Sequence, residues 1–196
     1  MTTARDLRER VRRAYGAAAE DPDNKHPFPV GRRFAASLGY PPQQLAELPE
    51  VSVDAFAGVS NVAITAEIPF GATVLDLGCG AGLDSLLAAV KTGPLGRVIG
   101  VDFCGTMLDR ARRGAAEAGL RNIEFLEGDA ERLLVADASV DVALANGIFN
   151  LNPLRDAVFQ ELARVVRPGG VVFAAELILR GAQETSQPTD EANWFA

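Results

Sequence analysis

From residue 73 onward the chain alternates short apolar runs with segments in which apolar residues recur every three or four positions. The apolar runs, rich in Val, Ile, Leu and Phe, predict strands at residues 73–77, 97–102, 122–129, 140–146 and 170–179. The spacing between them predicts helices at residues 82–91, 105–118 and 153–166. This alternation is typical of an α/β fold: a doubly wound, mostly parallel sheet with helices on both faces.

The residues before this alternation have a different pattern. Residues 3–20 are expected to form an amphipathic helix, because apolar side chains recur at helical spacing. Those side chains are Leu7, Val11, Ala14 and Ala18. Three prolines interrupt the next segment, "DPDNKHPFPVG", and short helical pieces are expected over residues 31–70. We therefore expect an N-terminal helical cap and lid segment at residues 1–70 and a sheet domain at residues 71–196.

Composition and charge narrow the class of protein. The chain has 196 residues, 48% of them apolar, and no uncharged run approaches the roughly 18 residues that a membrane-spanning helix needs. The charged N-terminus lacks the apolar core of a secretory signal, so we expect a cytoplasmic protein that does not contact membranes. A net charge of −7 disfavours nucleic acid as a partner. Cys79 and Cys104 lie in separate motifs without metal-ligand spacing, so neither a disulfide nor a metal site is expected.

A glycine-rich turn joins the first predicted strand to the first predicted helix in "TVLDLGCGAGLDSLLAAV". Gly78, Gly80 and Gly82 allow a tight turn and let a ligand approach the backbone without meeting a Cβ atom. Ligands of such sheets bind at the carboxyl ends of the strands, so the residues at other strand ends belong to the same site. These residues are Asp102, Asp129 with Ala130, and Asn146.

Three residues narrow the class of ligand. Asp102 lies about 20 residues beyond the glycines, where a carboxylate accepts both hydroxyls of a ribose, although it could instead cap the next helix. A nicotinamide-type turn needs glycine at its sixth position, where this chain has Leu83. Asp76 would repel a pyrophosphate and attract a cation. Together they favour S-adenosylmethionine, which carries a ribose, an ammonium and a sulfonium but no phosphate.

Four motifs, "VLDLGCGAG", "GVDFCGTML", "EFLEGDAERL" and "RVVRPGG", resemble those of class I S-adenosylmethionine-dependent methyltransferases in order and spacing. The resemblance implies a Rossmann-like domain that binds S-adenosylmethionine at residues 71–196, with "RPGG" as the turn into the fifth strand. It also implies a set of cofactor-binding residues. They are Tyr15 from the N-terminal helix, Asp76, Gly78, Cys79 and Gly80 at the methionine end, Asp102 at the ribose, Phe103 and Met107 beside the adenine, Asp129 and Ala130 at its amino group, and Asn146.

Longer segments, among them "LGYPPQQLAELPE" and "NGIFNLNPLRDAVFQELARVVRPGG", are similar to arsenite methyltransferases. That family holds trivalent arsenic with cysteine thiolates, at positions where this chain has Val59 or Ser60 and Gly147. Cys79 and Cys104 lie elsewhere. We therefore expect a methyltransferase with a different small-molecule acceptor. The alternatives are arsenite methylation, a noncatalytic S-adenosylmethionine-binding or scaffold protein, and a nicotinamide-dependent oxidoreductase.

Methyl transfer from a sulfonium depends mainly on positioning, and a general base is needed only if the acceptor must lose a proton early. Asn146 and Asn150 follow the fourth strand and are predicted to face the methyl group. His26, the only histidine, is either a base or an ordinary loop residue. Glu176 is either an acid that points inward or the polar side of a strand.

The end of the chain departs from the methyltransferase pattern. After "AELILR" the remaining residues are too few and too polar for the strand hairpin that closes one edge of such a sheet. We therefore expect either a fragment of a longer protein or a partner chain over the open edge, which would give a homodimer.

Overall fold

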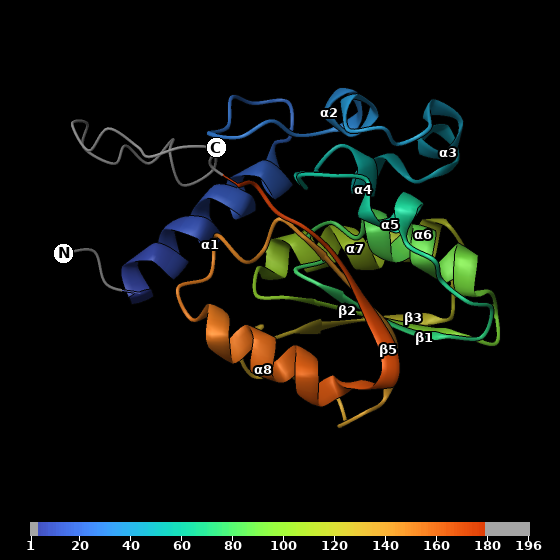
Figure 1. Cartoon of the computed structure of the whole chain (residues 1–196). Coiled ribbons are helices and arrows are strands. Elements are labelled where there is room, and N and C mark those ends of the chain that lie inside the picture. The colour runs from blue at the N-terminus through green and yellow to red at the C-terminus, as the bar shows by residue number, and fades with distance from the viewer. Residues whose placement is uncertain (1–3, 179–196) are drawn as a thin grey trace.

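A five-stranded parallel sheet forms the centre of the structure, a computed structural model that describes residues 4–178 (Figure 1). Its strands are β1 (Thr73–Leu77), β2 (Arg97–Asp102), β3 (Ile123–Glu127), β4 (Val140–Asn146) and β5 (Val166–Ala175). The order is β3-β2-β1-β4-β5, and every neighbouring pair is parallel. The predicted doubly wound sheet is confirmed. The order reverses between β1 and β4, where sheets of this kind bind their ligands.

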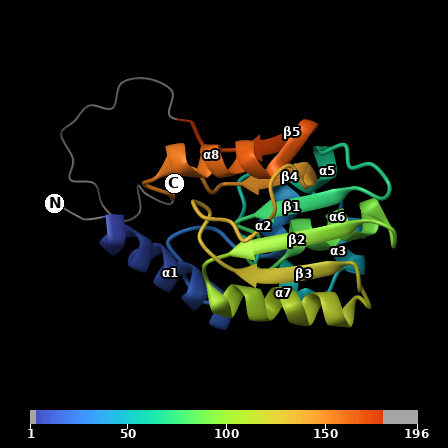
Figure 2. The same ribbon diagram turned by 90° about the horizontal axis from the view of Figure 1, so that it is seen from below.

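Helices cover both faces of the sheet. They are α1 (Ala4–Glu20), α2 (Arg32–Ser37), α3 (Pro42–Glu47), α4 (Glu50–Val53), α5 (Val62–Thr65), α6 (Leu83–Thr92), α7 (Gly105–Glu117) and α8 (Arg155–Val165). The short cap helices α2–α5 lie on the same side as α6 and α7, and α8 lies on the other side (Figure 1). Figure 2 shows α1 beyond the carboxyl ends of the strands. Within residues 4–178, no helix combines the length and apolar character that crossing a membrane requires.

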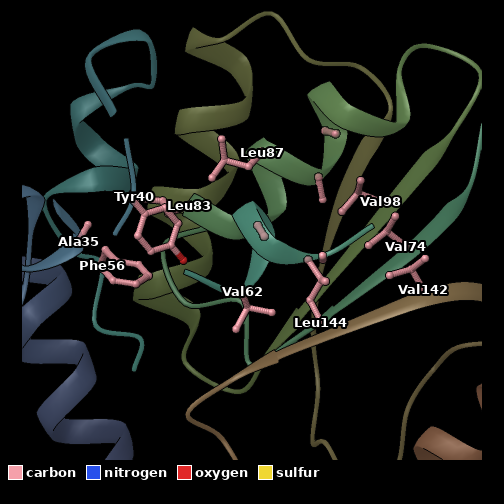
Figure 3. Packing of buried hydrophobic residues seen from close by; sticks show 14 of the residues in the cluster. Ala35, Tyr40, Phe56, Val62, Val74, Leu83, Leu87, Val98, Val142 and Leu144 are labelled. Carbon is pink, nitrogen blue, oxygen red and sulfur yellow. The ribbon is translucent and has the colours of Figure 1, made fainter. Parts of the chain in front are cut away.

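Alternating side chains along the central strands divide the core into two layers. Val74 of β1 and Leu144 of β4 pack in the layer that contains α6 and the cap, whereas Leu75 and Ala143 pack in the layer that contains α8. Tyr40 of the cap belongs to the same cluster as Val74 and is almost fully buried (Figure 3). Cap and sheet therefore share one core, while the predicted domain boundary between them stays a prediction.

The fifth strand begins earlier than predicted. The strand expected at residues 170–179 is observed as β5, which starts at Val166. Its pairing with β4 shifts after Val140, because the "RPGG" segment bulges out before the ladder resumes. Sequence reasoning reads Pro and Gly as a turn and so places the strand start after them. The prediction of a missing hairpin concerns residues 181–196, which lie outside the described residues, and the homodimer through the sheet edge stays a prediction.

Lys91 of α6 links the cap to the sheet domain through hydrogen bonds. Its ammonium donates hydrogen bonds to the carbonyl oxygens of Ala63 (2.7 Å), Ile64 (2.9 Å) and Ala66 (3.1 Å), where α5 ends. Replacing Lys91 with Met keeps an apolar stem and removes these bonds, so we expect the free energy of unfolding to fall by about 2 kcal/mol. Urea denaturation measures this loss. Lys25→Met, in an exposed loop, is the control, and equal losses in both variants would contradict the assignment.

Candidate functional site

A cavity lies at the carboxyl ends of β1, β2 and β4 and is bordered by α1 and the cap. We call it the first cavity. Every residue predicted to bind the cofactor lines it: Tyr15, Asp76, Gly78, Cys79, Gly80, Asp102, Phe103, Met107, Asp129, Ala130 and Asn146. The structure thus brings together residues from five separate segments, and their individual roles stay predictions.

The glycine turn borders this cavity with bare backbone. Gly78, Gly80 and Gly82 have φ angles of +71°, +52° and +86°, which residues with a Cβ atom rarely adopt. A Cβ atom at Gly80 would meet nothing within 4 Å, whereas one at Gly82 would lie 2.9 Å from the Cβ atom of Ala111 in α7. Gly80 therefore leaves open space for a ligand, and Gly82 allows α6 and α7 to pack closely.

Asp102 holds the turn in place from the end of β2. Its Oδ2 accepts a hydrogen bond from the backbone N–H of Gly80, and its Oδ1 accepts one from that of Cys104, both at 2.8 Å. The second bond holds the backbone of Cys104, which is the N-cap residue of α7, so Asp102 itself is not the helix cap. Each carboxylate oxygen can accept a further hydrogen bond, which leaves room for two ribose hydroxyls.

A second acid, Asp84, lies next to Asp76 and was missed by sequence reasoning because it falls inside a predicted helix. Its Oδ1 accepts a hydrogen bond from the Tyr40 hydroxyl at 2.5 Å, and its Oδ2 accepts one from the Asn146 amide at 2.8 Å. Asp76 accepts a hydrogen bond from the hydroxyl of Ser85. Burial raises the pKa of both acids, and burial together with the charge of Asp84 raises that of Asp76 to about 8. A cationic ligand would favour their ionised forms.

Asn146 connects β4 to the loop before α5. Its amide nitrogen donates to the carbonyl oxygen of Ser60 at 2.7 Å, in addition to its bond with Asp84. Its Oδ1 accepts hydrogen bonds from the backbone N–H groups of Val59 (2.8 Å) and Ser60 (3.0 Å). The side chain therefore positions the cap loop, and its predicted place facing the methyl group stays a prediction.

The structure does not bring the other two candidates for catalysis into the first cavity. The Asn150 amide donates to the carbonyl oxygen of Leu177 at 2.7 Å, which joins the loop after β4 to the segment after β5. His26 Nε2 lies 2.8 Å from the carbonyl oxygen of Asp21 in its own loop. Neither residue lines the first cavity, whereas Asn150 lines the second cavity described below. Local hydrogen bonds orient both loops, and the catalytic roles of both residues stay predictions.

Helix α1 borders the first cavity and is attached to its rim by two arginines. The Arg8 guanidinium pairs with Glu131 and lies 3.5 Å from Oδ2 of Asp129. The guanidinium carbon of Arg12 lies 5.4 Å from the ring centre of Phe103, a cation–π contact. Arg8 and Glu131 both line the cavity, yet they lie 123 positions apart in the chain, so no local pattern indicates their pairing.

A second cavity adjoins the first. The residues that line both cavities are Tyr15, Ala57, Gly58, Gly147 and Leu151. At this junction a Cβ atom on Gly147 would lie 2.9 Å from Cγ1 and 3.7 Å from Cβ of Val59. Gly147 is therefore a neighbour in space of Val59, which is one of the two residues, Val59 or Ser60, at which the resemblance places the other arsenic-binding cysteine.

Comparison with known proteins shows which family this chain belongs to. Residues 70–193 match the methyltransferase domain family. The chain belongs to this family. An arsenite methyltransferase from Halobacterium salinarum is 41% identical over 141 residues, which are 72% of this chain and 36% of the relative. A demethylmenaquinone methyltransferase from Lactococcus lactis is 37% identical over 119 residues, 61% of this chain and 44% of the relative.

A solved structure extends the likeness to three dimensions. The arsenic (III) S-adenosylmethionine methyltransferase from Chlamydomonas reinhardtii superposes with a TM-score of 0.54 and 32% identity, over 72% of this chain and 48% of that one. The chain thus spans between about a third and a half of the length of the relatives compared. S-adenosylmethionine is the cofactor of this methyltransferase domain. The open space at Gly80 and the buried acids Asp76 and Asp84 fit this cationic nucleoside.

Replacing Arg8 with alanine tests whether α1 retains the cofactor. The variant removes the contacts with Glu131 and Asp129, and such partly exposed pairs contribute at most about 1 kcal/mol. We expect S-adenosylhomocysteine, the demethylated product, to dissociate about three- to fivefold faster, as measured by stopped-flow displacement. Arg113→Ala is the control, because Arg113 pairs with Glu117 on the exposed side of α7. An unchanged dissociation rate would show that α1 does not retain the ligand.

Proposed function

We propose that this domain transfers a methyl group from S-adenosylmethionine to a small-molecule acceptor. The observation that carries the proposal is the pair of adjoining cavities, whose common wall includes Tyr15, Gly58 and Gly147. The first cavity contains the predicted cofactor residues, and the second offers an acceptor a route to the same junction. Gly58 and Gly147 allow close packing at that junction, because a Cβ atom at Gly58 would lie 2.6 Å from the amide nitrogen of Asn146 and one at Gly147 would lie 2.9 Å from Cγ1 of Val59.

The chemistry that the cofactor supplies is an electrophilic methyl group on a sulfonium. The protein's task is to hold an acceptor atom in line with that methyl group, and positioning of this kind accounts for much of the rate enhancement in such displacements. Asn146 supports the junction because it fixes the loop that contains Gly58 and Val59. Methyl transfer by such positioning requires no general acid or base in the first cavity.

Arsenite methylation is the weaker alternative. Val59, Ser60 and Gly147, the residues at the expected cysteine positions, carry no thiol, and arsenic requires thiolate ligands. Burial raises the pKa of Cys79 well above its usual range, which suppresses the thiolate form of the one cysteine that lines the first cavity among the described residues. The names of the relatives, which include arsenite and demethylmenaquinone methyltransferases, leave the acceptor of this chain open.

Two measurements test the proposal. Titration calorimetry should show that the protein binds S-adenosylmethionine and S-adenosylhomocysteine, and absence of binding by either would overturn the proposal. A cofactor-release assay with arsenite, thiols, quinols, phenols and amines should then show transfer to at least one acceptor. Binding without transfer to any acceptor would instead support a noncatalytic S-adenosylmethionine-binding protein.

A further inference from the structure

The second cavity has a mostly apolar wall with one charged group. Aromatic rings of Tyr15, Phe28 and Phe34 contribute to this wall, and aliphatic side chains and glycines supply most of the rest. Glu176 is the only charged residue among the described residues that line it. A pocket of this kind selects an apolar molecule with one polar group, placed where the charged residue lies.

The aromatic rings are fixed by stacking. The rings of Tyr15 and Phe28 lie 4.5 Å apart between centroids at an interplanar angle of 27°, and Phe28 is buried. Phe34, on α2, lies 6.2 Å from the ring of Phe56. Walls of stacked and tilted rings favour a ligand that is itself aromatic, because offset and edge contacts between rings add to the burial of apolar area.

Glu176 is held at the end of β5 with its carboxylate available for a ligand. Its Oε2 accepts a hydrogen bond from the backbone N–H of Asn150, and its Oε1 accepts one from that of Leu177, both at 3.0 Å. Each oxygen can accept one more hydrogen bond. An acceptor molecule with an O–H group can donate a hydrogen bond to the Glu176 carboxylate. The charge of Glu176 would repel a molecule that carries a carboxylate of its own.

Tyr15 lies close to Asp102, which lines the first cavity, and to Glu176, which lines the second. Burial raises the pKa of Tyr15, and the charges of Asp102 and Glu176 raise it further. Its hydroxyl therefore stays protonated at neutral pH, and Tyr15 lines both cavities. Glu176 is thus the group in the second cavity that can take a proton near the junction.

We infer that the second cavity binds a compact aromatic acceptor with a neutral hydroxyl group, and that Glu176 is the catalytic base. This inference rests on the proposed function. The acceptor's O–H donates to the Glu176 carboxylate. The bond between sulfur and the methyl carbon breaks as the new O–C bond forms, and the proton passes to Glu176 and then to water. The products are an aryl methyl ether and S-adenosylhomocysteine.

Binding measurements test the aromatic selectivity without turnover. With the protein saturated by S-adenosylhomocysteine, calorimetry should show binding of 2-naphthol and at least tenfold weaker binding of 2-naphthoate, which has the same rings and a negative charge. Phe34→Ala should weaken the binding of 2-naphthol several-fold while the affinity for S-adenosylhomocysteine stays the same. Phe70→Ala, an exposed aromatic outside both cavities, is the control. Equal affinity for both probes would overturn the inference.

Turnover tests the role of Glu176. Glu176→Gln keeps oxygen and shape but loses the basic carboxylate, so kcat for methylation of 2-naphthol should fall about 100-fold with little change in KM. The affinity for S-adenosylmethionine should not change. Glu67→Gln, at an exposed position outside both cavities, should keep full activity.

The outcomes separate this inference from the proposed function. If the protein binds no S-adenosylmethionine, the proposed function fails and this inference fails with it. If it methylates other acceptors and ignores 2-naphthol, only the inference fails. Methylation of 2-naphthol at the same rate by wild type and Glu176→Gln would overturn the role of Glu176 as base.

Discussion

Replacing Asp102 with alanine is expected to weaken the binding of S-adenosylmethionine at least about 100-fold. The substitution removes the carboxylate that would accept both ribose hydroxyls, and each hydrogen bond to a charged group is worth about 1.5 to 3 kcal/mol. It also leaves the N–H groups of Gly80 and Cys104 without the oxygens that hold them in this structure. The glycine turn would then lose its fixed shape. Titration calorimetry gives the dissociation constants.

A control separates this effect from loss of fold. Asp109→Ala removes an exposed acid from α7, where Asp109 pairs with Arg112, and should bind the cofactor like the wild type. Urea denaturation of both variants shows whether Asp102→Ala is still folded under the binding conditions. A dissociation constant within threefold of the wild-type value, in a folded Asp102→Ala protein, would remove Asp102 from the cofactor site.

Changing Asp76 to asparagine is expected to alter how stability and binding depend on pH. The pKa of Asp76 is raised from 3.8 to about 8, so the folded protein holds a proton there that the unfolded chain releases. This proton stabilises the fold fully below the unfolded pKa, and its contribution is lost as pH rises to about 8. The free energy of unfolding of the ligand-free protein should thus fall by about 2 kcal/mol between pH 6 and pH 8. Asp76→Asn should show a much smaller fall.

Binding of the cofactor should have the opposite dependence on pH. A cation favours ionised Asp76, so the affinity for S-adenosylmethionine should rise about tenfold per pH unit below pH 8 and then level off. The asparagine variant should bind about tenfold or more weakly at pH 8 and lose most of this rise. Chemical denaturation and calorimetry at pH 6, 7 and 8 measure both effects. Parallel pH curves for the two proteins would show that another group is responsible.

Those parts of the fold that depend on local pattern could be predicted from the sequence. The apolar alternation in β1 and β4 and the glycine turn before α6 follow from side-chain period and backbone freedom, which neighbouring residues determine. Asp102, Asp129 and Asn146 could be named because each lies at or just after the carboxyl end of a strand, whereas Tyr15 on α1 and Met107 on α7 were named only from the resemblance to methyltransferases. Asp102 was assigned in this way, and it lies where the parallel sheet requires.

Contacts between distant segments could not be predicted. Asn146 was placed at the end of a strand, but nothing in the sequence indicates that its amide hydrogen bonds with Ser60 and Asp84. His26 and Asn150 have residue types suited to catalysis, yet the backbone of their loops turns them away from the first cavity. The start of β5 was missed for a related reason, since a bulge followed by renewed pairing depends on the neighbouring strand.

The shared core of cap and sheet also bears on the order of folding during synthesis. The hydroxyl of Tyr40 and the amide of Asn146 are in contact although 106 residues separate them in the chain. A ribosome completes the cap helices long before it completes β4, and contacts of such long range form only when both partners are available. The apolar side of the nascent cap therefore stays only partly covered until Val142 and Leu144 of β4 have emerged. During that interval we expect the exposed apolar surface to be open to binding by chaperones.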